Sequence, residues 1–305
     1  MIVRPQENWF RMLFVWNGSV LQSIIPQLIF VALVDTVAVA TDGSVFGQKV
    51  PLNTTPFTLV GVALTIFLAF RNNASYSRYW EARQLWGDVL IAGRVLASQV
   101  SAYVPADAHF ERRAFIHKLI AFTYAMKHQL RGTDPFEDMT RYLSAERSAA
   151  LLNRHYRPVA LITDLREALA ERRASGAISC QQLLMLDTQV NRLAAAVTGC
   201  ERIASTPIPY PYGVLLHRTV YAYCLLLPFG LVDSIGIATP IIAVFVSYTL
   251  IALEAIASEV AEPFGKLPNS LPLNALTRSF ERSLLEQCGE ELPPELTADR
   301  GYQLT

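Results

Sequence analysis

Four apolar stretches set what this chain can fold into, and they cover residues 24–40, 57–70, 214–232 and 235–257. A membrane crossing needs about 20 mostly apolar residues, with about 17 as the lower limit. The last two stretches are separated only by a short turn around Asp233, Ser234 and Gly236, which is typical of a helical hairpin that crosses a membrane twice. The first two stretches are shorter and alone are not decisive, and buried helices of a soluble core are the alternative for them.

Composition favours the membrane alternative. Apolar residues make up 52% of the 305 residues and charged residues 17%, against about 45–50% and about 25% in soluble domains. The formal net charge is zero, so the total charge gives no support for a nucleic-acid partner. Four cysteines stand far apart without a zinc-binding spacing, which predicts free thiols used as small apolar residues.

The distribution of charge predicts the orientation in the membrane. Between residues 71 and 211 lie 18 of the 26 basic residues but only 13 of the 26 acidic ones. Basic residues also precede the first stretch, whereas residues 41–56 hold one Lys and one Asp and resemble an external loop. Because basic segments stay in the cytoplasm, we expect four spans with both termini and the basic middle on the cytoplasmic side.

The middle of the chain has helical periodicity throughout. Apolar residues recur every three or four positions within 112–130, 158–174 and 180–203. Helix breaks are expected at Pro105, Gly132–Pro135, Pro158 and Gly176. We therefore predict an all-α protein of a single domain, with a helical cytosolic region at about 71–211 and 258–288 and a loosely held tail at 289–305.

No catalytic or metal-binding motif is present, and the five histidines do not pair at metal-ligand spacing. We therefore expect no enzyme activity, no cofactor and no bound metal. Asp35 lies within the first apolar stretch, where a carboxylate needs a protein partner or water. Helix packing and contact with permeating ions remain open for Asp35, and ion contact also remains open for Glu259 and Glu262.

Residues 64–87 join an apolar segment to a polar, aromatic one without Gly or Pro before Gly87, so one helix can carry both halves. On that helix Val62, Ile66 and Phe70 form one strip, because four-residue steps drift by only about 40°. One turn further on the same face presents Asn73 and Ser77. In a single chain, this strip predicts packing against the core. If identical helices from several chains surround an axis, the same strip forms an apolar collar that gates ions by dewetting.

The segment FRNNASYSRYWEARQLWG at 70–87 resembles a signature of the bacterial bestrophins. Three further segments resemble the family in the same order, WFRMLFVWNGSVLQSIIPQ near the start, ERIASTPIPYPYGVLLHRTVYAYCLLLPFGLVD at 201–233 and EVAEPFGKLPNSLPL at 259–273. The resemblance covers about residues 5–285. It implies a homopentamer in the bacterial inner membrane that conducts small monovalent ions along its axis.

The resemblance also implies functional positions. The narrow neck of the family corresponds to Val62, Ile66 and Phe70. A second, cytosolic constriction corresponds to Ile178 in SGAISC. The alternative, equally supported, is that Ile178 is an ordinary buried isoleucine in a loop. Polar and aromatic residues beyond the neck are expected to line the vestibule or pack between subunits, where Arg and aromatic residues dominate desolvated contacts. These residues are Asn73, Ser77, Arg78, Trp80 and Glu81.

One departure concerns calcium. Animal bestrophins follow their PFG motif with acidic residues that help to hold calcium, whereas this chain reads PFGKLPNSLP. Because calcium prefers six to eight oxygens, usually including several carboxylates, we predict no calcium site here. The family resemblance implies anion conduction, but the apolar neck leaves cation conduction open. The alternatives are a membrane scaffold or transporter without conduction, and a soluble helical protein.

Overall fold

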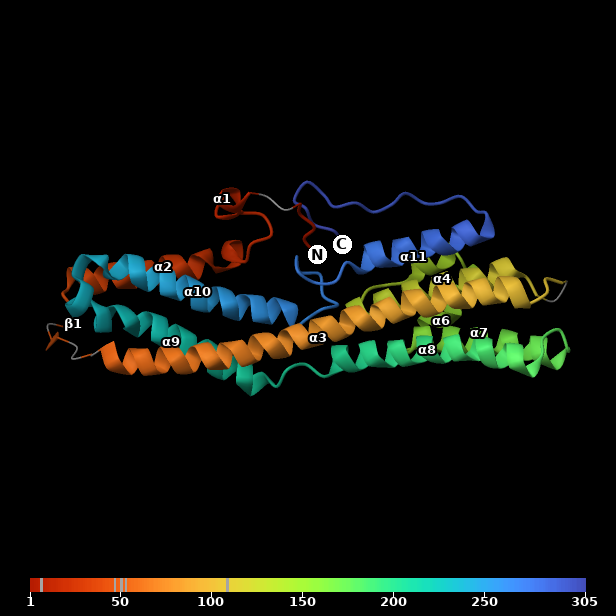
Figure 1. Ribbon diagram of the computed structural model, residues 1–305, viewed down its shortest axis with the longest axis horizontal. Coiled ribbons are helices and arrows are strands. Elements are labelled where there is room, and N and C mark those ends of the chain that lie inside the picture. Colours follow the sequence, from red (N-terminus) through yellow and green to blue (C-terminus); the bar gives the residue numbers. More distant parts are fainter. Residues whose placement is uncertain (6–7, 47, 50–51, 53, 108–109) are drawn as a thin grey trace. The chain divides into compact units, whose positions relative to one another are not determined.

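The computed structural model describes residues 1–5, 8–46, 48–49, 52, 54–107 and 110–305. The chain forms two compact units. We call the first, Pro5–Tyr79 with Pro207–Glu262, the apolar unit. The second, Met1–Arg4 with Trp80–Thr206 and Pro263–Thr305, is called the polar unit. Both are built almost entirely of helices, which confirms the all-α prediction (Figure 1).

The apolar unit packs three apolar helices with the first part of a fourth (Figure 1). Its elements are α1 (Trp9–Met12), α2 (Leu21–Ala40), β1 (Ser44–Val45), β2 (Gln48–Lys49), the start of α3 (Thr54–Tyr103), α9 (Tyr210–Ile235), η1 (Gly236–Ala238) and α10 (Thr239–Val260). The two short strands pair antiparallel within the expected external loop, part of which lies outside the described residues. A core of aliphatic side chains from α2, α3, α9 and α10 holds the unit together.

Three helical stretches are long and apolar enough to cross a membrane: Leu21–Ala40, Thr54–Tyr103 and Tyr210–Val260. The last includes both α9 and α10, which are separated by η1 where Gly236 adopts a φ of 52°. Glycine tolerates this backbone conformation at little cost, which explains the position of the turn. The predicted hairpin at 214–257 is therefore two helices joined by a tight connection.

Helix α3 runs without interruption for 50 residues, so the prediction of one helix over 64–87 is confirmed. A helix of that length measures about 75 Å, whereas the hydrocarbon core of a bilayer is about 30 Å thick. A membrane can therefore hold only part of α3. Its polar remainder, from Trp80 to Tyr103, belongs to the polar unit.

The polar unit packs the end of α3 with the remaining helices (Figure 1). These are α4 (Arg112–Arg131), α5 (Phe136–Thr140), α6 (Ala145–Leu152), α7 (Arg157–Ala174), α8 (Cys180–Ser205) and α11 (Leu273–Cys288). The predicted breaks coincide with helix ends. Gly132 closes α4 with a φ of 62°, Pro158 lies in the first turn of α7, and Gly176 separates α7 from α8 with a φ of 76°.

The segment after Cys288, predicted as loosely held, has little regular structure but makes several contacts. Val3 N–H donates to the Tyr302 carbonyl at 2.8 Å, and Leu304 N–H donates to the Met1 carbonyl at 2.8 Å. The guanidinium of Arg4 lies 4.8 Å from the centre of the Tyr302 ring. These contacts attach the end of the described chain to its beginning.

Candidate functional site

Helix α3 has two contrasting faces within the apolar unit. Leu64 and Leu68 are 2% and 1% exposed and lie in the core against α2, α9 and α10. Val62, Ile66 and Phe70 are 58%, 50% and 65% exposed. Since positions two residues apart point to well-separated sides of a helix, burial of the leucines holds the strip outward. The three side chains predicted to line the neck are therefore brought together on one exposed surface.

At the end of the apolar segment, polar contacts fix the rotation of α3 about its own axis. Arg71 donates through Nη1 to Glu254 Oε1 at 3.2 Å and through Nη2 to Ser258 Oγ at 2.8 Å, both on α10. Asn72 Nδ2 donates to the Leu68 carbonyl at 2.9 Å and to the Leu253 carbonyl at 3.4 Å. Residues 71 and 72 thus face α10, directly after Phe70 faces away from the unit.

Glu254 joins three helices beside the strip and was not predicted from the sequence. Its carboxylate also lies 3.3 Å from His217 Nδ1, so α3, α9 and α10 converge on one acid. The sequence did carry a signal, because a carboxylate within the fourth apolar stretch requires a partner. Nothing in the local pattern identified Arg71, which lies 183 residues away in the chain.

The predicted polar continuation of the strip is present. Asn73 and Ser77 are exposed, whereas Ser75 is fully buried between them. The exposed face of α3 therefore changes from hydrocarbon and phenyl groups to amide and hydroxyl groups within about one turn. Such a surface suits a narrow apolar passage that opens into water.

The three larger residues predicted to pack between subunits have contacts within their own chain. Arg78 Nε donates to the Ala261 carbonyl at 3.2 Å. Trp80 is 43% exposed, and the Arg83 guanidinium lies 5.1 Å from its ring centre. Arg202 donates to the carboxylate of Glu81. Their role between subunits stays a prediction.

The two remaining candidates are buried. Ile178 is 2% exposed in the loop between α7 and α8, so lining a passage would require the loop to turn this side chain outward. Asp35 is fully buried in α2, and its two carboxyl oxygens have no hydrogen-bond partner among the described residues. Asp35 therefore faces the helix bundle of its own chain.

Metal-ligating side chains do not cluster in the described part of the chain, where no group of three or more His, Cys, Asp or Glu could hold an ion. His109 lies outside the described residues. In the loop that follows α10, Lys266 and Leu267 are exposed and Ser270 is buried. The prediction that this loop holds no calcium rests on the lack of carboxylates in its residues 263–272.

Comparison with known proteins identifies the family. The family model described as bacterial and fungal bestrophin protein matches residues 1–286. A voltage-dependent anion channel-forming protein of Ralstonia nicotianae is 42% identical over 306 residues, which cover 100% of both chains. A protein of the same description from Escherichia coli is 41% identical over 308 residues, again covering 100% of both chains.

Solved structures agree with the sequence comparisons. The crystal structure of a bacterial bestrophin homologue from Klebsiella pneumoniae has a TM-score of 0.84 and 40% sequence identity, and the match covers 88% of this chain and 99% of that one. The crystal structure of a single-substitution variant of that homologue gives the same values. A family match over residues 1–286, relatives above 40% identity and a shared fold agree, and this chain belongs to the bestrophin family of membrane ion channels.

Proposed function

We propose that this chain is one subunit of a ring-shaped ion channel whose neck is lined by Val62, Ile66 and Phe70. The observation that carries the proposal is the exposure of these side chains, 50–65%, on a helix whose opposite face is 1–2% exposed. A helix held in this way presents an apolar strip that the described residues of its own chain leave at least half exposed. Copies arranged around an axis would bring the strips together.

The chemistry of the strip suits a gate. Valine, isoleucine and phenylalanine offer no group that could replace the hydration shell of an ion. A narrow collar of such side chains controls ion passage by wetting and dewetting, and it needs no ring of charge. Asn73 and Ser77 would line the wider, hydrated entrance beyond the collar, and a second constriction at Ile178 stays part of the proposal.

The proposal also covers the orientation of the chain in the membrane and the number of its copies in the channel. Helices α2, α9, α10 and the first part of α3 form four spans, with both termini and the polar unit in the cytoplasm. Arg4, Arg11 and Arg71 flank the first two spans on the side assigned to the cytoplasm. Five copies and an inner-membrane location follow from the family resemblance. Arg78, Trp80 and Glu81 would contribute to the surface between copies.

We infer anion conduction from the relatives, which are named voltage-dependent anion channel-forming proteins. The neck residues themselves do not determine whether anions or cations pass. The edge of the Phe70 ring carries a positive rim that favours anions, whereas the ring face attracts cations. Cation conduction is therefore the alternative within the same architecture.

One observation favours a different role for the strip. Val62 and Ile66 also line an open apolar groove of about 420 Å³ together with Tyr223 and Leu250. A neighbouring protein could fill this groove and cover both side chains. That arrangement corresponds to a membrane scaffold or transporter without an axial passage.

Reversal potentials test these alternatives. Purified protein is placed in a planar bilayer with asymmetric potassium chloride, and its subunit number is measured by light scattering in detergent. A current that reverses near the equilibrium potential of chloride supports anion conduction. A current that reverses near the equilibrium potential of potassium shows that the channel conducts cations instead. Absence of current from a folded oligomer, or a monomer in every detergent, would favour the scaffold.

A further inference from the structure

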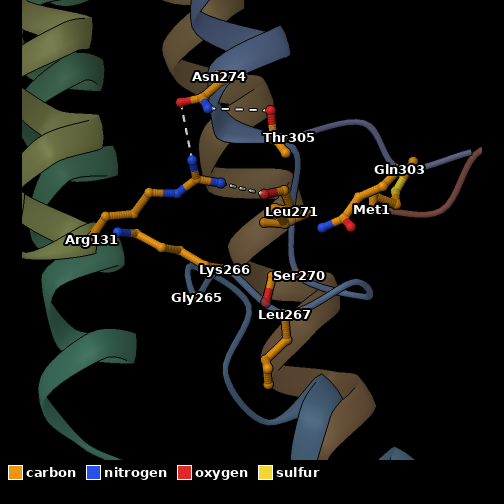
Figure 2. A pocket seen from close by; sticks show the side chains of 10 residues that line it. All are labelled: Met1, Arg131, Gly265, Lys266, Leu267, Ser270, Leu271, Asn274, Gln303 and Thr305. Atoms are coloured by element: carbon orange, nitrogen blue, oxygen red, sulfur yellow. Dashed lines mark hydrogen bonds between the residues drawn. The ribbon is translucent and has the colours of Figure 1, made fainter. Parts of the chain in front are cut away.

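A cavity in the polar unit lies between the end of α4, the loop of residues 263–272, the start of α11 and the two ends of the described chain (Figure 2). Its volume is about 170 Å³, roughly ten times the 10–15 Å³ that one water molecule requires. The cavity is too small for a nucleotide, since sites for larger ligands measure about 300–1,000 Å³. It is lined by Met1, Arg131, Gly265, Lys266, Leu267, Ser270, Leu271, Asn274, Gln303 and Thr305.

Arg131 brings a positive charge to this cavity without an acidic partner among the described residues. Its Nη1 donates to Asn274 Oδ1 at 3.0 Å and its Nη2 to the Leu271 carbonyl at 3.3 Å, both neutral oxygens (Figure 2). Its Nε is buried and has no hydrogen-bond partner in the described part of the chain. Burial lowers the pKa of this guanidinium below its ordinary value. Buried charges in proteins are normally paired, so the Arg131 guanidinium lacks the anionic partner that its burial calls for.

No lining side chain supplies the missing negative charge. None of the ten lining side chains is an aspartate or glutamate. Lys266 adds a second cation, is exposed, and makes no ion pair with any described residue. Of the five N–H groups of a guanidinium, Arg131 uses two in its bonds to Asn274 and Leu271. Three N–H groups of Arg131 therefore have no hydrogen-bond partner among the described residues.

The N–H of Ala275 at the start of α11 is already occupied, because it donates to the Thr305 main-chain oxygen at 2.8 Å. Arg131 and Lys266 both supply charged N–H groups from its wall. A planar guanidinium with free N–H groups favours carboxylate and phosphate oxygens.

We propose that this cavity is a binding site for a small oxyanion of the size of inorganic phosphate, with Arg131 as its principal partner and Lys266 as the second cation. The same chemistry accepts free phosphate or the carboxylate of a small metabolite. Bound there, the anion would link α4 to the loop that precedes α11. The proposal does not depend on ion conduction.

Calorimetry of the full-length protein in detergent tests the site. Inorganic phosphate and acetate are titrated separately into protein held in chloride buffer of matched ionic strength. We expect saturable binding of at least one anion, weakened about tenfold or more by Arg131→Gln and several-fold by Lys266→Gln. Lys118→Gln, on the same helix but outside the cavity, serves as the matched control and should bind normally.

The two probes identify the source of the ligand. Tighter binding of phosphate assigns the site to phosphate groups, and tighter binding of acetate assigns it to carboxylates. Absence of saturable binding in the unsubstituted protein would overturn the proposal, as would equal binding by all three variants. If Arg131→Gln does not fold, Lys266→Gln decides the outcome, because Lys266 is exposed and makes no ion pair among the described residues.

Discussion

Arg71 on α3 and Glu254 on α10 form an ion pair of 3.2 Å in which each side chain is only 12% exposed. The pair lies immediately after the exposed strip and ties α3 to the neighbouring helix. Because Phe70 precedes Arg71 in the helix, a contact that fixes Arg71 against α10 also fixes the outward direction of Phe70. The pair therefore connects the packing of one chain to the proposed neck.

Replacing Glu254 by Gln should lower the stability of the protein. The substitution leaves the largely buried Arg71 without its charge partner, and hydrogen bonds to charged groups contribute about 1.5–3 kcal/mol. Thermal unfolding in detergent should show a lower midpoint. Asp233→Asn is the matched control, since its pair with Lys49 leaves the two side chains 49% and 52% exposed and should contribute less than about 1 kcal/mol. Equal losses in both variants would contradict this role of Glu254.

Gly230→Ala should disturb the contact between α9 and α3. A Cβ atom at Gly230 would lie 2.4 Å from Cε2 of the Phe57 ring, too close for any carbon contact. Overpacking of this kind costs about 1–3 kcal/mol, so the unfolding midpoint should fall. Gly87→Ala is the control, because nothing lies within 4 Å of its added Cβ, and it should stabilise the helix by about 0.5–1 kcal/mol. A stable Gly230→Ala variant would show that Phe57 moves aside easily.

The sequence predicted α3 and the helix ends well, because both depend on local chemistry. The lack of Gly and Pro before Gly87 predicted the long helix. Gly132 and Gly176 adopt positive φ angles at the expected helix end and helix break. Hydropathy places the start of α3 at residue 57, whereas the helix begins at Thr54. Polar residues in a first turn do not interrupt a helix, so hydropathy alone misplaces that boundary.

Long-range relationships were not accessible in the same way. The spacing of Val62, Ile66 and Phe70 indicated a common strip, but not whether that strip faced the core or the outside. Burial of Leu64 and the contact of Arg71 with Glu254 decide this, and both depend on helices far along the chain. The surroundings of Ile178 were equally hidden, because a short loop motif carries no information about burial.

Asp138 should make the polar unit sensitive to acid. Burial favours its neutral form, but hydrogen bonds from His128 Nε2 at 2.9 Å and Lys127 Nζ at 2.8 Å outweigh burial and hold the carboxyl pKa below its ordinary 3.8. A depressed pKa gives stability that is present above the unfolded value and is lost as pH falls through the folded one. The stability difference between the protein and Asp138→Asn should persist at neutral pH and shrink below about pH 4. A difference that grows on acidification would contradict the assignment.

Removal of calcium should leave channel activity unchanged. The segment of residues 263–272 offers Lys266, Leu267, Asn269 and Ser270 where a calcium site needs carboxylates. Bilayer currents measured before and after addition of a calcium chelator should therefore coincide. A chelator selective for transition metals provides the comparison. Loss of current on chelation, restored by added calcium, would show that oxygen ligands from elsewhere complete a site.

Ile66→Ala should increase conductance, because a smaller side chain widens the proposed collar and keeps it wetted. Ile66→Arg should instead shift the reversal potential towards the anion value, since each copy adds a positive charge to the same narrow ring. Ile241→Ala is the matched control: Ile241 is 76% exposed on α10 and does not belong to the strip. Single-channel recordings in planar bilayers measure both effects. If Ile66→Ala leaves conductance at the level of Ile241→Ala and Ile66→Arg leaves selectivity unchanged, then the exposed face of α3 packs against protein or lipid and the passage lies elsewhere.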